Sequence, residues 1–218
     1  MSSRSLHVFT NLAISMDGKI STAQRELFAL GTPHDRRMMD VHRRRAHAVL
    51  WGAATLRCFK GAATLRSLRG NGQHPINVIL TSNPDFNPRW PFFKQRHMTR
   101  ILLVPRTVPA ARLKPFMKSC EILRYRSLAT FPEELIAHLE RRGCESLLLE
   151  GGGGTIFPFV KKDLVDEWNV TVTPKIVGGA DAPTMVDGEG FRARDIKRYR
   201  LKKCLKRGDE LYLQYLRR

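Results

Sequence analysis

Short apolar segments alternate with helix-forming segments along most of the chain, and this alternation restricts the fold more than any other feature. Segments of this length are typical of buried strands rather than of helices. Five are clear, namely His7–Ile14, Ala48–Trp51, Ile76–Leu80, Arg100–Val104 and Ser146–Glu150. Glu121–Tyr125 is a weaker one, and Trp168–Thr173 alternates between apolar and polar residues. Strands separated by helices usually form a parallel sheet that the helices cover. We therefore predict an α/β fold with a mostly parallel central sheet flanked by helices.

Helices are predicted at three places. The first begins at Pro33 and runs to about Arg45, because its acidic first turn and basic last turn suit the helix dipole. The segment Pro132–Arg142 has its leucine and isoleucine side chains on one face, and Thr155–Lys162 follows the last clear strand. The segment Asn83–Gln95 is rich in proline and aromatic residues and is predicted to be a loop.

The C-terminal part of the chain predicts an antiparallel hairpin. Tyr199–Cys204 and Leu211–Leu216 are strand-like and flank a turn at Arg207–Asp209. Such a hairpin would make the central sheet mixed, with an antiparallel edge. No linker of domain length interrupts the chain, so residues 1–218 are predicted to form a single domain.

Four consecutive glycines follow the strand Ser146–Glu150. Glycine lets backbone N–H groups approach a ligand without obstruction by a Cβ atom, and the N-terminus of the next helix adds unpaired donors. The pattern is neither that of a dinucleotide fingerprint nor that of a P-loop. A tight structural turn is the alternative, but four glycines in a row are entropically costly for a turn alone. We predict a seat for phosphate groups at Gly151, Gly152, Gly153, Gly154 and Thr155.

Two other strands also end in small and polar residues. Asp17 and Lys19 flank a glycine after His7–Ile14, at the strand end where ligands of α/β proteins bind. An ordinary turn at Asp17 explains this segment equally well. Gly52–Thr55 follows Ala48–Trp51 and is the third strand end of the same type.

The chain is strongly basic, with 38 Lys and Arg residues against 20 Asp and Glu residues and a formal net charge of +18. A basic domain suggests nucleic-acid binding. However, the basic residues occur in short groups along the whole chain, and no zinc finger or aromatic RNA-binding signature accompanies them. The same charge would attract a phosphorylated small molecule. We therefore expect no nucleic-acid partner.

Cysteine and histidine spacings argue against a metal site. Cys58, Cys120, Cys144 and Cys204 form no C-x-x-C pair, and no H-E-x-x-H motif occurs. No apolar run approaches the roughly 18 residues that span a bilayer, and the N-terminal residues do not resemble a signal peptide. Because unpaired thiols suit a reducing compartment, we expect a cytoplasmic protein without a metal or a membrane span.

Three spaced motifs resemble those of the riboflavin-biosynthesis reductases, the family of the C-terminal reductase domain of RibD and of the standalone diaminohydroxyphosphoribosylaminopyrimidine reductases. Asn11–Ile20 resembles N-x-A-x-S-x-D-G-K-I, and Ala48–Thr55 resembles A-[IV]-L-x-G-x-x-T. The third motif is Glu150–Gly152, followed by Leu164–Glu167 and Pro174–Gly179. The resemblance covers nearly the whole chain and implies a dihydrofolate-reductase-like fold and a homodimer.

The resemblance implies an NADPH-dependent reductase. The family reduces the ribosylamino group of 5-amino-6-(5-phosphoribosylamino)uracil, or of its diamino-pyrimidinone analogue, to a ribitylamino group. A phosphorylated pyrimidine is then the expected partner. Two alternatives remain, namely an NADPH reductase of the same fold that acts on a pterin or dihydrofolate, and a non-catalytic relative that binds a phosphate-rich ligand or nucleic acid.

The resemblance also implies roles for individual residues. The cofactor would contact Ala13, Thr55, Ser82 and the glycine loop, and the substrate would contact Ser15, Lys19, Arg43, Arg66 and Glu150. Guanidinium groups bind phosphate esters in a bidentate manner, which suits Arg43 and Arg66 as phosphate contacts. A proton must be managed while the sugar ring opens, and either Glu150 or Asp17 could handle it.

The chain departs from the family in the segment that follows the second motif. Cys58–Gly61 stands where the family has A-D-D-P, so both acidic residues are absent, and Ala29 occupies a position where tryptophan is common. One of the missing carboxylates contacts NADP in the family. These differences are consistent with a divergent branch that has an altered substrate.

Overall fold

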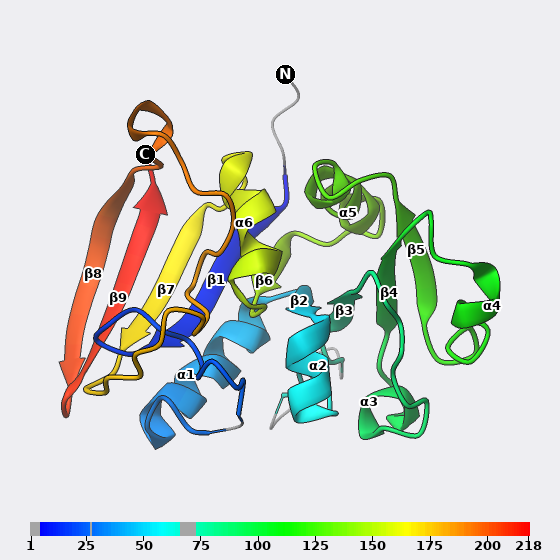
Figure 1. Cartoon of the computed structure of the whole chain (residues 1–218), viewed down its shortest axis with the longest axis horizontal. Coiled ribbons are helices and arrows are strands. Elements are labelled where there is room, and N and C mark those ends of the chain that lie inside the picture. The colour runs from blue at the N-terminus through cyan, green and yellow to red at the C-terminus, as the bar shows by residue number, and fades with distance from the viewer. Residues whose placement is uncertain (1–4, 27, 66–72) are drawn as a thin grey trace.

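The computed structural model describes residues 5–26, 28–65 and 73–218, and its strands join one sheet (Figure 1). The strands are β1 (His7–Ile14), β2 (Ala48–Gly52), β3 (Ile76–Leu80), β4 (Arg100–Pro105), β5 (Glu121–Tyr125), β6 (Ser146–Leu149), β7 (Glu167–Val172), β8 (Tyr199–Arg207) and β9 (Glu210–Arg217). Their order is β5-β4-β3-β2-β6-β1-β7-β9-β8. Neighbours are parallel from β5 to β7, whereas β9 is antiparallel to β7 and β8. The predicted mixed, mostly parallel sheet with a C-terminal hairpin is confirmed.

Helices cover both faces of this sheet. They are α1 (Pro33–Arg45), α2 (Ala53–Phe59), α3 (Pro91–Lys94), α4 (Ala110–Leu113), α5 (Phe131–Arg141) and α6 (Gly153–Lys161), with a 3₁₀ turn at Ala193–Asp195. Successive strand residues enter different cores: Val8 belongs to the core under α5 and α6, and Phe9 to the core under α2, α3 and α4. Because both faces are covered at the centre of the sheet, strands such as β2 and β6 are mostly apolar in sequence.

Three short helices are absent from the sequence-based prediction. Helix α2 has only seven residues with Leu56 as its buried residue, which is too little to produce a recognisable helical pattern. Helix α3 lies within Asn83–Gln95, which was predicted to be a loop, and buries Phe92 and Phe93. Helix α4 spans a single turn. The prolines and aromatic residues that indicated a loop therefore also start and anchor a short helix.

The glycine turn after β6 is shorter than predicted. Gly152 is the N-cap of α6, and Gly153 and Gly154 are its first two residues, so the helix begins before Thr155. Glycine is unfavourable mainly in the interior of a helix, so it costs less in the first turn. The backbone N–H groups of the first turn have no partner inside the helix, whichever residues stand there. The strand also ends one residue earlier than predicted, at Leu149, which places Glu150 in the loop.

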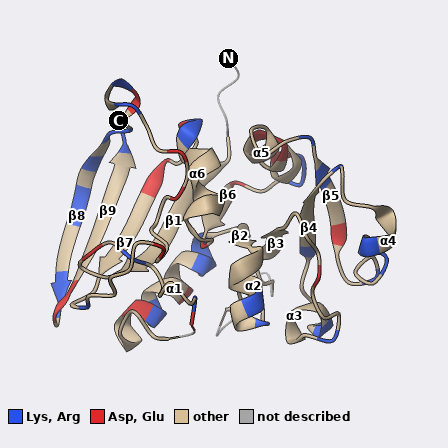
Figure 2. Cartoon of the chain, in the orientation of Figure 1, with Lys and Arg blue, Asp and Glu red and all other residues tan. Residues whose placement is uncertain are grey.

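Lys and Arg residues are distributed over strands and helices in many parts of the molecule, including β8, α1 and α6 (Figure 2). This matches the scattered basic groups of the sequence. Within residues 5–26, 28–65 and 73–218, no helix combines the length and the apolar character needed to cross a membrane.

Candidate active site

A cavity of about 540 Å³ lies where the carboxyl ends of three parallel strands meet. Strand β6 lies between β1 and β2, so the segments that follow these strands share one edge of the sheet. The cavity is lined, among others, by Ala13, Asp35, Arg43, Thr55, Phe59, Glu150 and the glycines 151–154. Residues of Asn11–Ile20, Ala48–Thr55 and Glu150–Gly152 therefore line one cavity, although Asp17 and Lys19 do not. This is the usual ligand position in an open α/β sheet.

Two glycines of this edge are needed by the packing of the protein itself. A Cβ atom at Gly52 would lie 2.6 Å from the hydroxyl oxygen of Thr155, and one at Gly151 would lie 2.9 Å from two Thr155 side-chain carbons. The backbone N–H of Glu150 also donates to the Leu50 carbonyl at 3.1 Å. Close packing of the β2 and β6 ends therefore explains Gly52 and Gly151, as the structural-turn alternative requires.

The next three glycines differ in what surrounds them. A Cβ atom at Gly153 would lie 2.4 Å from the backbone nitrogen of Asp187 and 2.6 Å from the Thr184 carbonyl oxygen. At Gly154 nothing lies within 4 Å of such an atom, and at Gly152 only an Ile20 methyl carbon does, at 4.0 Å. Gly152 and Gly154 thus face open space at the start of α6, where unpaired N–H groups and the helix dipole favour an anion.

Glu150 is fixed in the cavity wall by three hydrogen-bond donors from two residues. Arg43 donates from Nε to Oε1 at 2.9 Å and from Nη2 to Oε2 at 2.7 Å, and Trp51 donates from Nε1 to Oε2 at 3.0 Å. The side chains of Arg43 and Glu150 are only 11% and 7% exposed. The structure therefore brings these two predicted substrate contacts together as a largely buried ion pair that lines the cavity.

The predicted contacts Ser15, Asp17 and Lys19 do not line this cavity. The Asp17 carboxylate accepts hydrogen bonds from the backbone at 177–178, at 3.1 and 2.7 Å. A hydrogen bond from Ser15, together with these two, lowers the pKa of Asp17 to about 2. Lys19 donates from Nζ to the Ala182 carbonyl at 3.0 Å. This motif fastens the 177–182 segment to the end of β1, and its predicted ligand roles remain predictions.

The other predicted contacts are divided between the cavity and its surroundings. Ala13, near the end of β1, and Thr55, in α2 just after β2, both line the cavity, as expected. Ser82 is exposed and does not line it, although Leu80 at the end of β3 does. Arg66 lies outside the described residues.

Phe59 lines the cavity at a position where the resemblance to the riboflavin-biosynthesis reductases implies an acidic residue. Its side chain is 56% exposed, and its ring centroid lies 5.9 Å from that of the buried Trp51. Lys60, the second replaced position, ends α2 in the left-handed conformation, with φ of 54°. This part of the cavity is therefore aromatic rather than acidic.

Asp35 lines the cavity, although the sequence identified it only as an acidic residue that suits the first turn of α1. Burial, with a further contribution from Glu210 on β9, raises the pKa of its carboxyl group. Its side chain packs against Gly31, where a Cβ atom would lie 2.3 Å from Asp35 Oδ2. An acidic residue in the first turn is so common that it gave no signal of a cavity position, and Glu210 lies far away in sequence.

The chain is similar in sequence to reductases of riboflavin biosynthesis. The family model described as the RibD C-terminal domain matches residues 6–213. A 2,5-diamino-6-ribosylamino-4(3H)-pyrimidinone 5′-phosphate reductase from Archaeoglobus fulgidus is 32% identical, and the match covers 93% of this chain and 94% of the relative. The reductase of the same name from Methanothermobacter thermautotrophicus is 30% identical, with 96% and 97% covered.

Solved structures with the same fold extend this similarity. A pyrimidine reductase-like protein from Corynebacterium diphtheriae superposes with a TM-score of 0.82 at 16% identity, and the match covers 99% of this chain and 93% of that one. RibD from Acinetobacter baumannii gives 0.81 at 19% identity, with 100% and 59% covered. Dihydrofolate reductase from Enterococcus faecalis gives 0.56 at 14% identity, with 98% and 97% covered. The dihydrofolate-reductase-like fold predicted from the sequence is confirmed.

Proposed function

The chain belongs to the RibD C-terminal domain family, and on that premise we propose that it is a reductase of riboflavin biosynthesis. Its substrate is 2,5-diamino-6-ribosylamino-4(3H)-pyrimidinone 5′-phosphate, the compound in the names of the archaeal relatives that match almost end to end. The reaction converts the ribosylamino group into a ribitylamino group. The observation that carries the proposal is the cavity in which the three family motifs meet, with its buried Arg43–Glu150 pair and its open glycines.

The hydride donor in this proposal is NADPH, held with its phosphates at the start of α6. Gly152 and Gly154 support this position because their faces are open and the first turn of α6 presents unpaired N–H groups. Ala13 and Thr55 line the same cavity and are the proposed contacts of the nicotinamide end and of the rest of the cofactor. When bound, NADPH supplies a hydride, and the chain needs no nucleophile for this chemistry.

Arg43 and Glu150 orient the substrate in this proposal. Arg43 lies on α1, and its guanidinium is held by Glu150 in a fixed plane beside Trp51. A guanidinium held in this way is suited to bind the substrate 5′-phosphate without a large loss of side-chain entropy. Glu150 stays in place to accept hydrogen bonds, and both groups line the cavity in which the reacting atoms would be held close together.

Purified protein tests this function when it is mixed with NADPH and each of three compounds. These are the diamino-pyrimidinone phosphate, its deaminated uracil analogue, and dihydrofolate. We expect NADPH oxidation with one or both pyrimidine phosphates and none with dihydrofolate. Reduction of dihydrofolate alone would favour the pterin alternative, and NADPH oxidation with none of the three would favour a non-catalytic relative.

We also propose that the enzyme acts as a homodimer, as the resemblance implies. An apolar groove of about 640 Å³, lined by residues such as Trp168, Val170, Phe191 and Leu213, supports an interface on this part of the surface. Ile196, at the same groove, is 58% exposed. Light scattering should give twice the chain mass for the wild type, and Ile196→Asp should shift the protein toward a monomer. A monomeric wild type would contradict this part of the proposal.

A cytoplasmic location completes the proposed function. None of the four cysteines forms a disulfide bond, and Cys204 is exposed, which suits a reducing compartment. Fractionation of cells that express the protein from its natural gene should place it with the cytoplasmic enzymes.

A further inference from the structure

We propose that Asp35 is the catalytic acid that protonates the sugar ring oxygen of the substrate during ring opening. This inference rests on the proposed function and adds the group that supplies the proton. Asp35 lies in the first turn of α1 and lines the cavity, as does Arg43 on the last turn of the same helix. The helix therefore presents the proposed phosphate contact and the proposed acid to the same cavity.

The surroundings of Asp35 favour a carboxyl group that holds a proton. Its neighbours from β9 are Glu210 and Tyr212, its neighbour from β7 is the Thr171 hydroxyl, and His34 and Arg36 lie on its own helix. Burial is the largest influence and raises the pKa of Asp35, and the charge of Glu210 acts in the same direction. The Thr171 hydroxyl, His34 and Arg36 act in the opposite direction but do not outweigh burial, so the pKa of Asp35 is raised.

Glu210 differs from Asp35 because it is fixed as a carboxylate. It accepts hydrogen bonds from the Thr32 backbone N–H at 2.8 Å, from the Thr32 hydroxyl at 2.6 Å and from the Tyr212 hydroxyl. Burial would raise the pKa of Glu210, but these hydrogen bonds lower it below its ordinary value. When two neighbouring carboxyl groups share a site, the one with fewer donors takes the proton, which here is Asp35.

The other carboxyl groups that line the cavity have established partners. Glu150 accepts from Arg43 and Trp51, and Asp187 accepts from the Thr184 hydroxyl at 2.7 Å and from its N–H at 3.0 Å. Glu26 is exposed to solvent. Asp35 is thus the cavity carboxyl whose burial and neighbours best suit it to hold and donate a proton.

The proposed step is balanced in atoms and electrons. The lone pair of the exocyclic nitrogen forms a C1′=N bond while the bond between C1′ and the ring oxygen breaks and its electron pair stays on the oxygen. Asp35 donates its proton to that oxygen, which becomes the C4′ hydroxyl group. C1′ then accepts the hydride that the proposed cofactor supplies, and the nitrogen regains its lone pair. The Asp35 carboxylate is reprotonated from water.

The test compares Asp35→Asn, Asp35→Glu and the control Asp40→Asn, which changes a carboxyl on the same helix that pairs with Arg44 and does not line the cavity. We expect Asp35→Asn to lower kcat about 100-fold or more while the Kd for NADPH changes less than about twofold. The wild-type rate should fall as the pH rises through the pKa of Asp35. This fall should vanish in Asp35→Asn and persist, displaced, in Asp35→Glu.

An open-chain imine analogue of the substrate separates catalysis from folding. Its ring is already open, so Asp35→Asn should reduce it at nearly the wild-type rate. The assignment is overturned if Asp35→Asn retains kcat within about threefold of the wild type on the natural substrate, or if it loses activity equally on both compounds. If the wild type reduces neither compound, the proposed function fails as well, whereas failure of the variants alone leaves that function intact.

Discussion

Individual glycines separate the requirements of the fold from those of a ligand. Gly52, Gly151 and Gly153 are needed because a Cβ atom at each would collide with neighbouring protein atoms. Gly152 and Gly154 face open space, so packing does not explain them. A run of four glycines therefore serves two purposes, since alternate members serve the chain and the proposed cofactor.

A carboxylate at Gly152 should repel the phosphates of NADPH without disturbing the fold. Gly152 has an ordinary φ of −70°, and its Cβ position is free of close contacts. We expect Gly152→Asp to weaken NADPH binding about tenfold or more and Gly152→Ala to have a much smaller effect. Titration of NADPH fluorescence measures both variants. Equal affinity of Gly152→Asp and the wild type would contradict the proposed phosphate position.

Loss of the Glu150 charge should affect both stability and substrate binding. Glu150→Gln leaves the largely buried guanidinium of Arg43 without its anionic partner, which should cost about 2–4 kcal/mol of the free energy of unfolding. The KM for the pyrimidine phosphate should rise because Arg43 is no longer held in one plane. Urea unfolding and steady-state kinetics measure these effects. Unchanged stability and KM would show that the ion pair does not organise the cavity.

At the level of elements, the start of α6 depends on its contact with the 184–187 segment. Gly153→Ala places a methyl group against the Asp187 nitrogen and the Thr184 carbonyl, so we expect a loss of about 1–3 kcal/mol in urea unfolding. Gly154→Ala is the matched control, since nothing lies within 4 Å of its Cβ position. This control should leave the stability unchanged or raise it by up to about 1 kcal/mol. Equal effects of the two variants would contradict the account of the α6 start.

The strands and the longer helices were predictable from sequence, and the short helices were not. Parallel strands such as β3 and β6 are buried on both faces, so most of their residues are apolar instead of alternating with polar ones. Helix α5 has an amphipathic repeat over three turns, whereas α2 buries only Leu56 and has no repeat to detect. Helix α6 begins at Gly153, two residues before the predicted start at Thr155. The difference arises because consecutive glycines indicate a turn in sequence even where they begin a helix.

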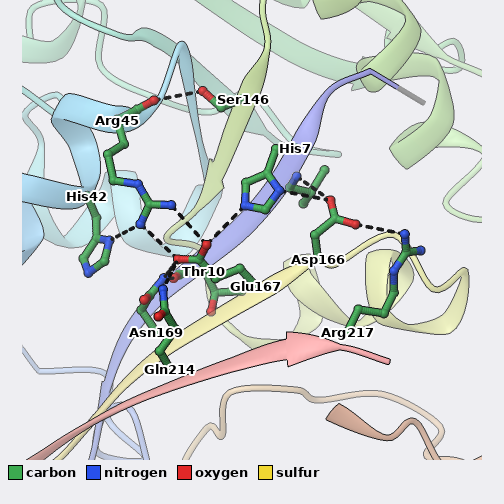
Figure 3. A network of polar contacts seen from close by, with 11 residues as sticks. His7, Thr10, His42, Arg45, Ser146, Asp166, Glu167, Asn169, Gln214 and Arg217 are labelled. Atoms are coloured by element: carbon green, nitrogen blue, oxygen red, sulfur yellow. Dashed lines mark hydrogen bonds and ion pairs between the residues drawn. The ribbon is translucent and has the colours of Figure 1, made fainter. Parts of the chain in front are cut away.

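At the level of the whole molecule, a polar network connects α1 with the C-terminal hairpin (Figure 3). Glu167 on β7 accepts hydrogen bonds from Arg45 at 2.9 and 3.0 Å, from Asn169 at 2.8 Å and from Gln214 on β9 at 2.9 Å. His42 on α1 lies beside Arg45, with 3.4 Å between its Nδ1 and Arg45 Nη1. This network holds α1, which carries Arg43 and Asp35, against the sheet.

The network predicts how stability depends on pH. Burial, aided by the charge of Arg45, lowers the pKa of His42 to about 4 in the folded protein. In the unfolded chain this histidine binds a proton already below about pH 6.5. The free energy of unfolding therefore falls as the pH drops below about 6.5. Burial alone would raise the pKa of Glu167, but its hydrogen bonds with His7, Arg45, Asn169 and Gln214 hold it well below its usual range. The stabilisation from Glu167 is therefore complete above about pH 4.3 and is lost below it.

Substitutions should remove each of these two phases separately. In urea unfolding measured between pH 7 and pH 3, His42→Gln should abolish the decline that begins near pH 6.5, and Glu167→Gln should flatten the decline below about pH 4.3. If stability is constant across this range in the wild type, the network does not titrate as described.

The site was only partly predictable because its residues meet through the fold rather than along the chain. The residues that lie near strand ends or match family positions were predictable, and they line the cavity. They are Ala13, Arg43, Thr55, Glu150 and the glycines 151–154. The position of Asp35 was not predictable, because its environment comes from β7 and from Glu210 on β9, which are distant in sequence. The fastening role of Asp17 also depends on a contact with a remote segment, at Gly178.

The most direct test of the proposed reaction follows the hydride itself. NADPH that carries deuterium at both C4 positions of the nicotinamide ring is incubated with the protein and the ribosylamino pyrimidine phosphate, and the product is examined by mass spectrometry and NMR. The account predicts a ribitylamino product with a single deuterium at C1′. Recovery of unreduced substrate, or a reduced product without deuterium at C1′, would contradict it.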